Sequence, residues 1–390
     1  MTSMKPHRRQ FIVTVSERPE ALASLPGFRT RPLAEDVFLH HDPELLITEE
    51  PDRLILGRML REGDGRYVTI RDGWLSLDAS GSLGVQYFRE GDVICASSPV
   101  LLSRFTQRNL RVPRSDIRFS WIASPFGPVE GSRRLFCDQS LELATRQTRV
   151  LSRDRVGPRA LDEAAAFVAA EFVEIARALG QTGHPLFVAL TGGQDSRTIF
   201  SALVAAGVPF RAFTLRLSDG ASHKDIRVAN AICKACGIEH VVVGAERGGA
   251  DSRLAAYLEH SRGIDGDRGR EYAAGNYYRQ LPDGALVLHG GSLGLSKLPY
   301  DEFLADLPDR SKTSVIGVFD RIFGPVPPDD AKALSQWYDY RERYAFSDLG
   351  DYFFLDQRRA AWGGDNRFAE DVFGFEWVLF ANSWPLIDAF

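Results

Sequence analysis

The chain has 390 residues, of which 44% are apolar and 25% charged, so it is long enough for two ordinary globular domains. Its formal net charge of −5 disfavours a nucleic-acid-binding protein, and its four cysteines are too few for a disulfide scaffold. No apolar run is long enough to cross a membrane, and no signal-peptide core follows the basic start. We therefore expect a cytoplasmic protein with no nucleic-acid or membrane partner.

The first third of the chain has the pattern of antiparallel sheet. Short runs of alternating apolar and polar residues extend from Gln10 to about Gly131, separated by Asp-Gly and Gly-Ser turns. A long amphipathic helix is expected next, because apolar residues recur at helical spacing before Gly180. These residues are Leu161, Ala165, Val168, Phe172, Ile175 and Leu179.

The pattern then changes to alternating strands and helices. Strands are predicted at 186–190, 210–216, 240–243 and about 284–290, and helices at 196–206 and 223–236. This alternation predicts a parallel sheet with right-handed crossovers, so the expected fold class is α/β. Beyond Ser311 the chain is predicted to be mostly helical and rich in aromatic residues.

The sequence TGGQDS, from Thr191 to Ser196, joins the first of these strands to its helix. Two adjacent glycines at the carboxyl end of a parallel strand let backbone N–H groups point at a ligand, and the helix adds its positive N-terminus. We therefore predict a phosphate site in which Ser196 donates a hydrogen bond and Asp195 acts through a bridging cation such as Mg²⁺. The turn is neither a Walker A motif nor a G-x-G-x-x-G motif.

TGGQDS resembles the S-G-G-x-D-S pyrophosphate loop of the PP-loop ATP pyrophosphatases, with Thr191 keeping the first hydroxyl. The segment DIRVANAICKACGIEH is similar to the D-x-x-x-A-x-x-x-A-x-x-x-G-x-x-H segment of the asparagine-synthetase-like branch. Its matching positions are Asp225, Ala229, Gly237 and His240. The strand-rich region before it resembles the antiparallel glutaminase half of class B asparagine synthetases.

This resemblance covers nearly the whole chain and implies two domains. Residues 1–135 would form a degenerate glutaminase-like domain of the Ntn type, which is mostly antiparallel sheet. Residues 155–390 would form the asparagine-synthetase-like ATP pyrophosphatase domain, an adenine nucleotide alpha hydrolase-like fold built on a parallel sheet.

The chemistry that the resemblance implies is amide bond formation with ATP and Mg²⁺ as cofactors. ATP adenylates a carboxylate, pyrophosphate leaves on the loop, and an amine attacks the acyl-adenylate. Asp195 would be the metal ligand and, with Ser196, the catalytic residue; Leu190 and Leu215 would flank the adenine. The implied nucleotide-binding residues are Leu190, Thr191, Gly192, Gly193, Gln194, Asp195, Ser196, Leu215, Asp225, Gly290 and Gly291.

The chain departs from the family pattern at three places. No cysteine opens the first strand, so we expect no glutaminase activity and an amine supplied by a substrate. The Asp-Glu pair that follows the fourth strand in the family is missing, and the candidate replacements are Asp265, Asp267, Glu271, Asp301 and Glu302. The family's late lysine is also missing: Lys297 is near the site in sequence order but does not stand at that position, and Arg358 and Arg359 are the candidate anion contacts.

We therefore expect an amide synthetase that releases AMP and pyrophosphate, in natural-product or peptide biosynthesis. Its relatives in style are the β-lactam synthetases and lasso-peptide cyclases, so lasso-type macrocyclisation is included. The partner would be a carboxylate-bearing small molecule or peptide, and a leader-peptide-binding or protease partner stays open. Two alternatives remain: another adenylating reaction such as sulfur transfer, and a non-catalytic relative that binds nucleotide or peptide.

Overall fold

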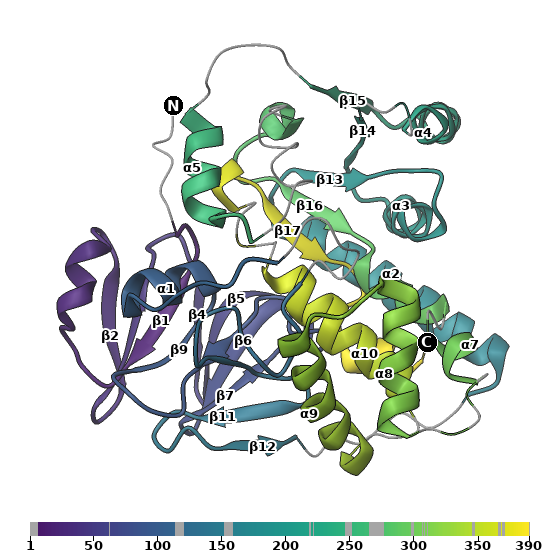
Figure 1. The fold of residues 1–390 in the computed structure, drawn as a ribbon. Helices are drawn as coiled ribbons and strands as arrows, with labels where there is room; N and C mark the ends of the chain where they lie inside the picture. The colour runs from purple at the N-terminus through teal and green to yellow at the C-terminus, as the bar shows by residue number, and fades with distance from the viewer. Residues whose placement is uncertain are drawn as a thin grey trace.

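The computed structural model describes residues 7–389 except 62, 114–120, 152–158, 218–219, 221, 246–251, 265–276, 298–299, 306, 308, 310, 345–347, 366–367 and 369–370. The described residues form two antiparallel sheets, one parallel sheet and helices packed around them (Figure 1). The protein is therefore mixed α/β, as the sequence predicts. Among these residues, no helix is both long enough and apolar enough to cross a membrane.

The first antiparallel sheet is flanked by the 3₁₀ helix η1 (Glu20–Ser24) and the helix α1 (Pro99–Thr106). Its strands are β1 (Phe11–Thr14), β2 (Arg29–Ala34), β3 (Val37–His41), β8 (Gln86–Tyr87), β9 (Val93–Ala96) and β10 (Arg133–Arg134). They lie in the order β10-β8-β9-β1-β3-β2. All of β1 is buried, which explains why three of its four residues are apolar without alternation.

The second antiparallel sheet also has six strands. They are β4 (Ile47–Glu50), β5 (Arg53–Arg61), β6 (Asp64–Arg71), β7 (Trp74–Leu77), β11 (Gln139–Glu142) and β12 (Thr148–Val150), in the order β12-β11-β7-β6-β5-β4. The two sheets share one core, in which Phe11 and Val13 pack with Leu56 and Val68. The antiparallel part of the chain therefore extends to β12.

The parallel sheet confirms the predicted alternation of strands and helices. Its strands are β13 (Leu186–Ala189), β14 (Arg211–Arg216), β15 (His240–Gly244), β16 (Leu286–His289) and β17 (Glu376–Leu379), in the order β15-β14-β13-β16-β17. All of its pairings are parallel. The last strand was not predicted, because the region beyond Ser311 was expected to be mostly helical.

Helices cover both faces of this sheet (Figure 1). They are α2 (Leu161–Gln181), α3 (Gln194–Ala206), α4 (His223–Cys236) and α5 (Ser252–Ser261). On one face, Ile175 of α2 and Leu203 of α3 pack against Val188 and Leu288. On the other face, Tyr257 of α5 packs in the same core as Phe213 and Val287.

Most of the remaining elements form a helical layer beside the parallel sheet. They are η3 (Gly291–Lys297), α7 (Asp301–Ala305), α8 (Lys312–Phe323), α9 (Pro328–Tyr344), α10 (Leu349–Phe353), the π-helix η5 (Phe354–Gly363) and α12 (Trp384–Ile387). The short helices η2 (Tyr277–Gln280) and η6 (Asp371–Phe373) pack instead in the core that α5 shares with the parallel sheet. Trp337 and Phe353 of this layer share a core with Trp121 and Phe136, which precede β11. The helical layer thus packs on the antiparallel part as well.

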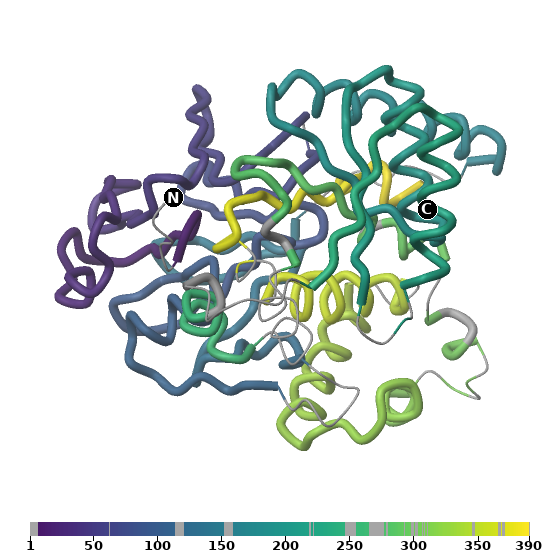
Figure 2. The backbone as a smooth tube through the Cα atoms, turned by 90° about the horizontal axis from the view of Figure 1, so that it is seen from above, coloured from purple at the N-terminus to yellow at the C-terminus, as the bar shows by residue number. Residues whose placement is uncertain are grey.

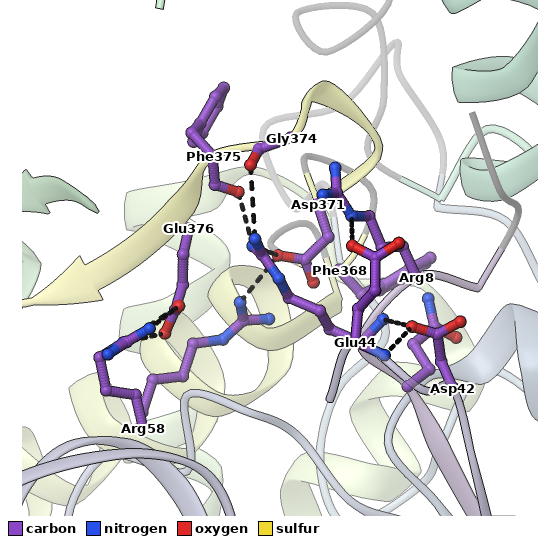
Figure 3. Close-up of polar contacts among 12 residues, drawn as sticks. Arg8, Asp42, Glu44, Arg58, Phe368, Asp371, Gly374, Phe375 and Glu376 are labelled. Atoms are coloured by element: carbon purple, nitrogen blue, oxygen red, sulfur yellow. Dashed lines mark hydrogen bonds and ion pairs between the residues drawn. The ribbon is translucent and has the colours of Figure 1, made fainter. Parts of the chain in front are cut away.

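Arginines of the antiparallel part also bind the last strand of the parallel sheet and the residues just before it (Figure 3). Arg58 Nη2 lies 2.9 Å from Glu376 Oε2, and Arg9 Nη1 donates to the Phe375 carbonyl at 2.8 Å. Arg66 Nη1 lies 3.4 Å from Asp371 Oδ1, and both of these side chains are buried. The antiparallel part therefore lies against the parallel sheet rather than apart from it, as the view from above shows (Figure 2).

Candidate nucleotide-binding site

The turn Thr191–Ser196 follows β13, the central strand of the parallel sheet. From β13 the chain moves outward through β14 to β15, and then returns to the other side of β13 with β16. The carboxyl ends of β13 and β16 therefore flank the point at which the strand order reverses. In open parallel sheets, ligands bind at this point.

The hydroxyl groups of the turn bind its own backbone. Thr191 N donates to Ser196 Oγ at 3.0 Å, and the two hydroxyl oxygens of Thr191 and Ser196 lie 3.0 Å apart. Gly193 N donates to Thr191 Oγ1 at 3.1 Å. Both hydroxyl side chains thus fix the shape of the turn, and Ser196 holds the turn closed in addition to any contact with a ligand.

Three backbone N–H groups remain at the start of α3. Within the described part of the chain, no hydrogen bond uses the N–H of Gln194, Asp195 or Ser196. The first N–H groups of a helix have no partner inside the helix, and they carry part of its positive dipole. Because α3 has 13 residues, its N-terminus is a strong binding site for an anion such as pyrophosphate.

Asp195 forms an ion pair with Lys297, at the end of η3. Lys297 Nζ lies 2.7 Å from Asp195 Oδ1, and the two side chains are 48% and 29% exposed. The lysine therefore occupies one coordination position of the carboxylate that the sequence assigns to a metal. Since both groups are partly solvated, the pair costs little to open.

The Asp225 side chain binds a backbone N–H group of the turn. Its Oδ1 accepts a hydrogen bond of 2.8 Å from Gly192 N. A Cβ at residue 192 would lie 3.1 Å from the same oxygen, so glycine allows this close approach. Asp225 comes from the first turn of α4, and it therefore ties the turn after β13 to the helix that precedes β15.

Gly290 lets the end of β16 lie close to the turn, and Gly291 lies against Arg359 of η5. A Cβ at residue 290 would lie 2.9 Å from the Asp195 Cβ, and a Cβ at residue 291 would lie 2.1 Å from Arg359 Nη2. A Cβ at residue 290 would thus clash with Asp195, whereas a Cβ at residue 291 would meet the end of the Arg359 side chain. The Arg359 guanidinium therefore lies beside the loop after β16.

The two neighbouring arginines of η5 have different surroundings. Arg359 is buried against Gly291. The guanidinium carbon of Arg358 lies 4.9 Å from the ring centroid of Trp121 and 4.8 Å from that of Trp362. Burial lowers the pKa of Arg358 from its ordinary value. Of the two candidate anion contacts, only Arg359 lies against one of the site glycines.

A cavity of about 230 Å³ opens beside the turn. Its lining includes Leu190, Thr191, Leu215 and Asp225, which are four of the residues predicted to bind nucleotide. Leu190 is fully buried, and its carbonyl accepts a 2.6 Å bond from the Thr214 hydroxyl. The cavity is below the ~300–1,000 Å³ of most ligand pockets, so it has room for part of a nucleotide.

The acids proposed as a second metal ligand lie outside the described parts of the structure. This holds for Asp265, Asp267 and Glu271, and for the side chains of Asp301 and Glu302. Among the described residues, no group of three His, Cys, Asp or Glu side chains is placed to hold a metal ion. Mg²⁺ often binds through one carboxylate together with phosphate oxygens, so Asp195 alone fits such a cation once a phosphate is present.

The structure adds a contact that the sequence did not indicate, between Thr214 and His240, the last matching position of the segment that begins at Asp225. Thr214 and His240 form a polar link beneath the turn, because His240 Nε2 lies 2.8 Å from Thr214 Oγ1. No spacing in the sequence signals this contact, since it joins two neighbouring strands.

No protein-family model matches the chain, and no curated protein sequence matches it.

Proposed function

We propose that the chain is an ATP-dependent amide synthetase that adenylates a substrate carboxylate and passes the acyl group to an amine. AMP and pyrophosphate are the other products. The proposal is carried by the turn Thr191–Ser196, which presents free N–H groups and the Asp195 carboxylate at the reversal point of a parallel sheet. Phosphate recognition next to an acid is the combination that magnesium nucleotides require.

In this proposal each residue has a defined task. The N–H groups of Gln194, Asp195 and Ser196 hold the leaving pyrophosphate, and Lys297 moves from Asp195 to a phosphate oxygen. Asp195 and the phosphates would hold Mg²⁺, which when bound neutralises the charge that develops on the leaving group. Asp225 keeps Gly192 in position, and the cavity between Leu190 and Leu215 takes the adenine.

The same proposal assigns a fold family to each part of the chain. The parallel sheet would be a PP-loop domain of the asparagine-synthetase-like type, and the antiparallel sheets a degenerate glutaminase-like domain. The latter would have no glutaminase activity, because its first strand does not begin with cysteine. The substrate would be a small carboxylate or a peptide, including one closed by lasso-type macrocyclisation, in the cytoplasm.

The test measures nucleotide binding and pyrophosphate release separately. ATP with Mg²⁺ should raise the melting temperature of the wild-type protein, and Asp195→Asn should abolish most of that rise. Asp72→Asn is a matched control, since Asp72 lies in an exposed turn of the antiparallel part. Pyrophosphate release is then measured with pooled carboxylates and peptides, and release that the Asp195 variant lacks supports adenylation.

A second candidate is a relative that binds nucleotide or peptide without catalysis. The ion pair between Lys297 and Asp195 favours it, because the lysine stands where a cation would bind. Binding of ATP that is independent of Mg²⁺ and unaffected by Asp195→Asn would support this candidate. The same result would contradict the amide synthetase.

A further inference from the structure

A second concave surface lies at the edge of the antiparallel part that β12 forms. Two cavities of about 530 and 360 Å³ meet there, and they share Tyr87, Arg89 and Thr148. One wall is the edge strand β12, and the other is the end of the helix α9. We call the two cavities together the arginine groove.

The groove is strongly cationic although the chain as a whole is acidic. No Asp or Glu is among the described residues that line either cavity. The arginines that line them are Arg89, Arg133, Arg134, Arg146, Arg149 and Arg343. An uncompensated cluster of guanidinium groups attracts carboxylates or phosphates.

Most of these arginines have no acidic partner in the described structure. Arg134 is the exception, because it binds Asp365 through two contacts of 2.8 Å and is buried. The others make contacts of a different kind: the Arg149 guanidinium lies 3.9 Å from the Trp74 ring centroid, and Arg133 Nη2 lies 3.4 Å from Gln336 Oε1. Their charge is therefore available to a ligand.

The strand β12, which lines the groove, has backbone groups with no partner among the described strands. Gln147 O accepts from Glu142 N, and Leu151 N donates to Asp138 O, so these residues face the neighbouring strand β11. In an antiparallel pair the bonded residues alternate, so the N–H and C=O of Thr148 and Val150 point away from β11. No described strand pairs with that edge.

The opposite wall is aromatic. Tyr340 and Tyr344 of α9 are four residues apart, and their ring centroids lie 5.0 Å from each other. The ring of Phe136 lies 5.0 Å from that of Tyr340. This row offers an apolar surface for side chains of a chain that is bound along β12.

We propose that the arginine groove binds an acidic peptide in extended conformation, which adds a strand to β12. The open backbone groups of Thr148 and Val150 would pair with the peptide, and Arg89, Arg146 and Arg343 would bind its carboxylates. A peptide supplies both alternating N–H and C=O groups and carboxylates. A nucleic acid supplies anionic groups but no backbone of alternating N–H and C=O groups, so the strand edge favours the peptide.

The test uses a fluorescein-labelled peptide of alternating Glu and Val, about six residues long, the length of an ordinary strand. Its binding to the full chain is followed by fluorescence anisotropy. The double variant Arg89→Gln/Arg343→Gln should raise the Kd by about tenfold or more, as expected when charge-assisted hydrogen bonds are lost. Arg18→Gln/Arg321→Gln removes the same charge from exposed positions outside the groove and should leave the Kd unchanged.

Two further probes separate the peptide from other occupants. A peptide N-methylated at alternate residues should bind at least about tenfold more weakly, because each lost backbone bond removes a strand contact. Equal binding by this peptide would overturn strand addition. A single-stranded oligonucleotide that binds more tightly, and is lost in the groove variant but not in the control, would assign the groove to nucleic acid instead.

An equal Kd in the groove and control variants would also overturn the proposal. Both groove substitutions are at exposed positions, and unchanged melting temperatures show that any loss of binding is local. The test does not depend on the nucleotide site, so its outcome is separate from that of the proposed synthetase activity.

Discussion

Two carboxylate–cation pairs in this molecule differ in what surrounds them. Asp195 and Lys297 meet at the turn with both side chains partly exposed, whereas Asp356 and Arg341 meet in the helical layer with none of either side chain exposed. Asp356 also accepts a 2.7 Å bond from Trp337 Nε1, and Arg341 binds Asp138 as well. The buried pair therefore has fixed partners, whereas the partly exposed pair costs little to open, and we expect it to exchange its partner for a ligand.

Breaking the buried pair should have the largest effect on stability. Arg341→Met would leave Asp138 and Asp356 buried without their cation, at a cost of about 3–5 kcal/mol. Burial already raises the pKa of Asp356, and Arg341 opposes that shift. Urea unfolding followed by tryptophan fluorescence measures the loss.

Arg343→Met is the matched control for that prediction. It lies two residues along the same helix, is exposed, and should cost less than ~0.5 kcal/mol. Equal losses for the two variants would show that Arg341 contributes no more than a surface arginine. The distinction between fixed and exchangeable pairs would then not hold.

A second buried polar cluster predicts a dependence of stability on pH. Burial lowers the pKa of His7 to about 3 and that of His260 to about 4. His260 Nδ1 accepts a 2.8 Å bond from the backbone N–H of His7, which favours the neutral His260 ring, and burial disfavours the charged form of both rings. Below pH 6.5 the unfolded chain binds protons that the folded chain does not, so stability falls as pH decreases towards the folded values.

The expected slope is up to about 1.4 kcal/mol per pH unit for each histidine. Burial raises the pKa of Asp64 to about 6, and this carboxyl acts in the opposite direction, so variants must be compared. His260→Gln should flatten the loss between pH 6.5 and 5 relative to wild type, and the exposed His223→Gln should not. The same slope in all three proteins would contradict the role of the buried pair.

Removing the hydrogen bond from Gly192 N to Asp225 should cost less stability than breaking the Arg341 pair and more than breaking the Lys297 pair. Asp225→Ala removes the acceptor of the Gly192 N–H and should cost about 1 kcal/mol. Asp225→Asn keeps a carbonyl oxygen in the same place and should stay close to wild type. Thermal unfolding measures both; an equally large loss for the Asn variant would assign the effect to the charge rather than to the turn.

Much of the fold follows from local patterns in the sequence. The helices α3 and α4 end at Gly207 and Gly237, whose φ values of 65° and 67° require the left-handed region that glycine adopts readily. Strand β13 and its turn follow from an apolar run and two glycines. The strand β17 was missed because its four residues, EWVL, lie among helical segments. Its pairing partner is β16, which is far away in the sequence.

The candidate site divides in the same way. Gly290 and Gly291 could be named from the family resemblance, and the structure adds that a Cβ at residue 290 would lie 2.9 Å from the Asp195 Cβ. The contact of Lys297 with Asp195 could not be assigned, because it depends on how η3 folds back towards α3. The sequence also predicted that Leu161 belongs to the apolar stripe of α2, yet it is 83% exposed at the first turn, where the helix extends beyond its core.

Removing Lys297 is the sharpest test of the exchangeable pair, although its effect on stability should be the smallest. Lys297→Met should change the free energy of unfolding by less than ~0.5 kcal/mol, since the pair is solvated. It should also raise the affinity for Mn²⁺, measured by electron paramagnetic resonance as a substitute for Mg²⁺, by about fivefold. A unit charge ~4 Å away contributes about 1 kcal/mol in water.

Lys312→Met is the control, because Lys312 also pairs with an aspartate, Asp339, but between two surface helices. It should leave Mn²⁺ binding unchanged, and Asp195→Asn should abolish the gain seen in Lys297→Met. If Lys297→Met binds Mn²⁺ no better than wild type, the lysine does not compete for Asp195. The pair would then be a fixed structural contact like that of Arg341, and the turn would bind phosphate without the help of a cation on Asp195.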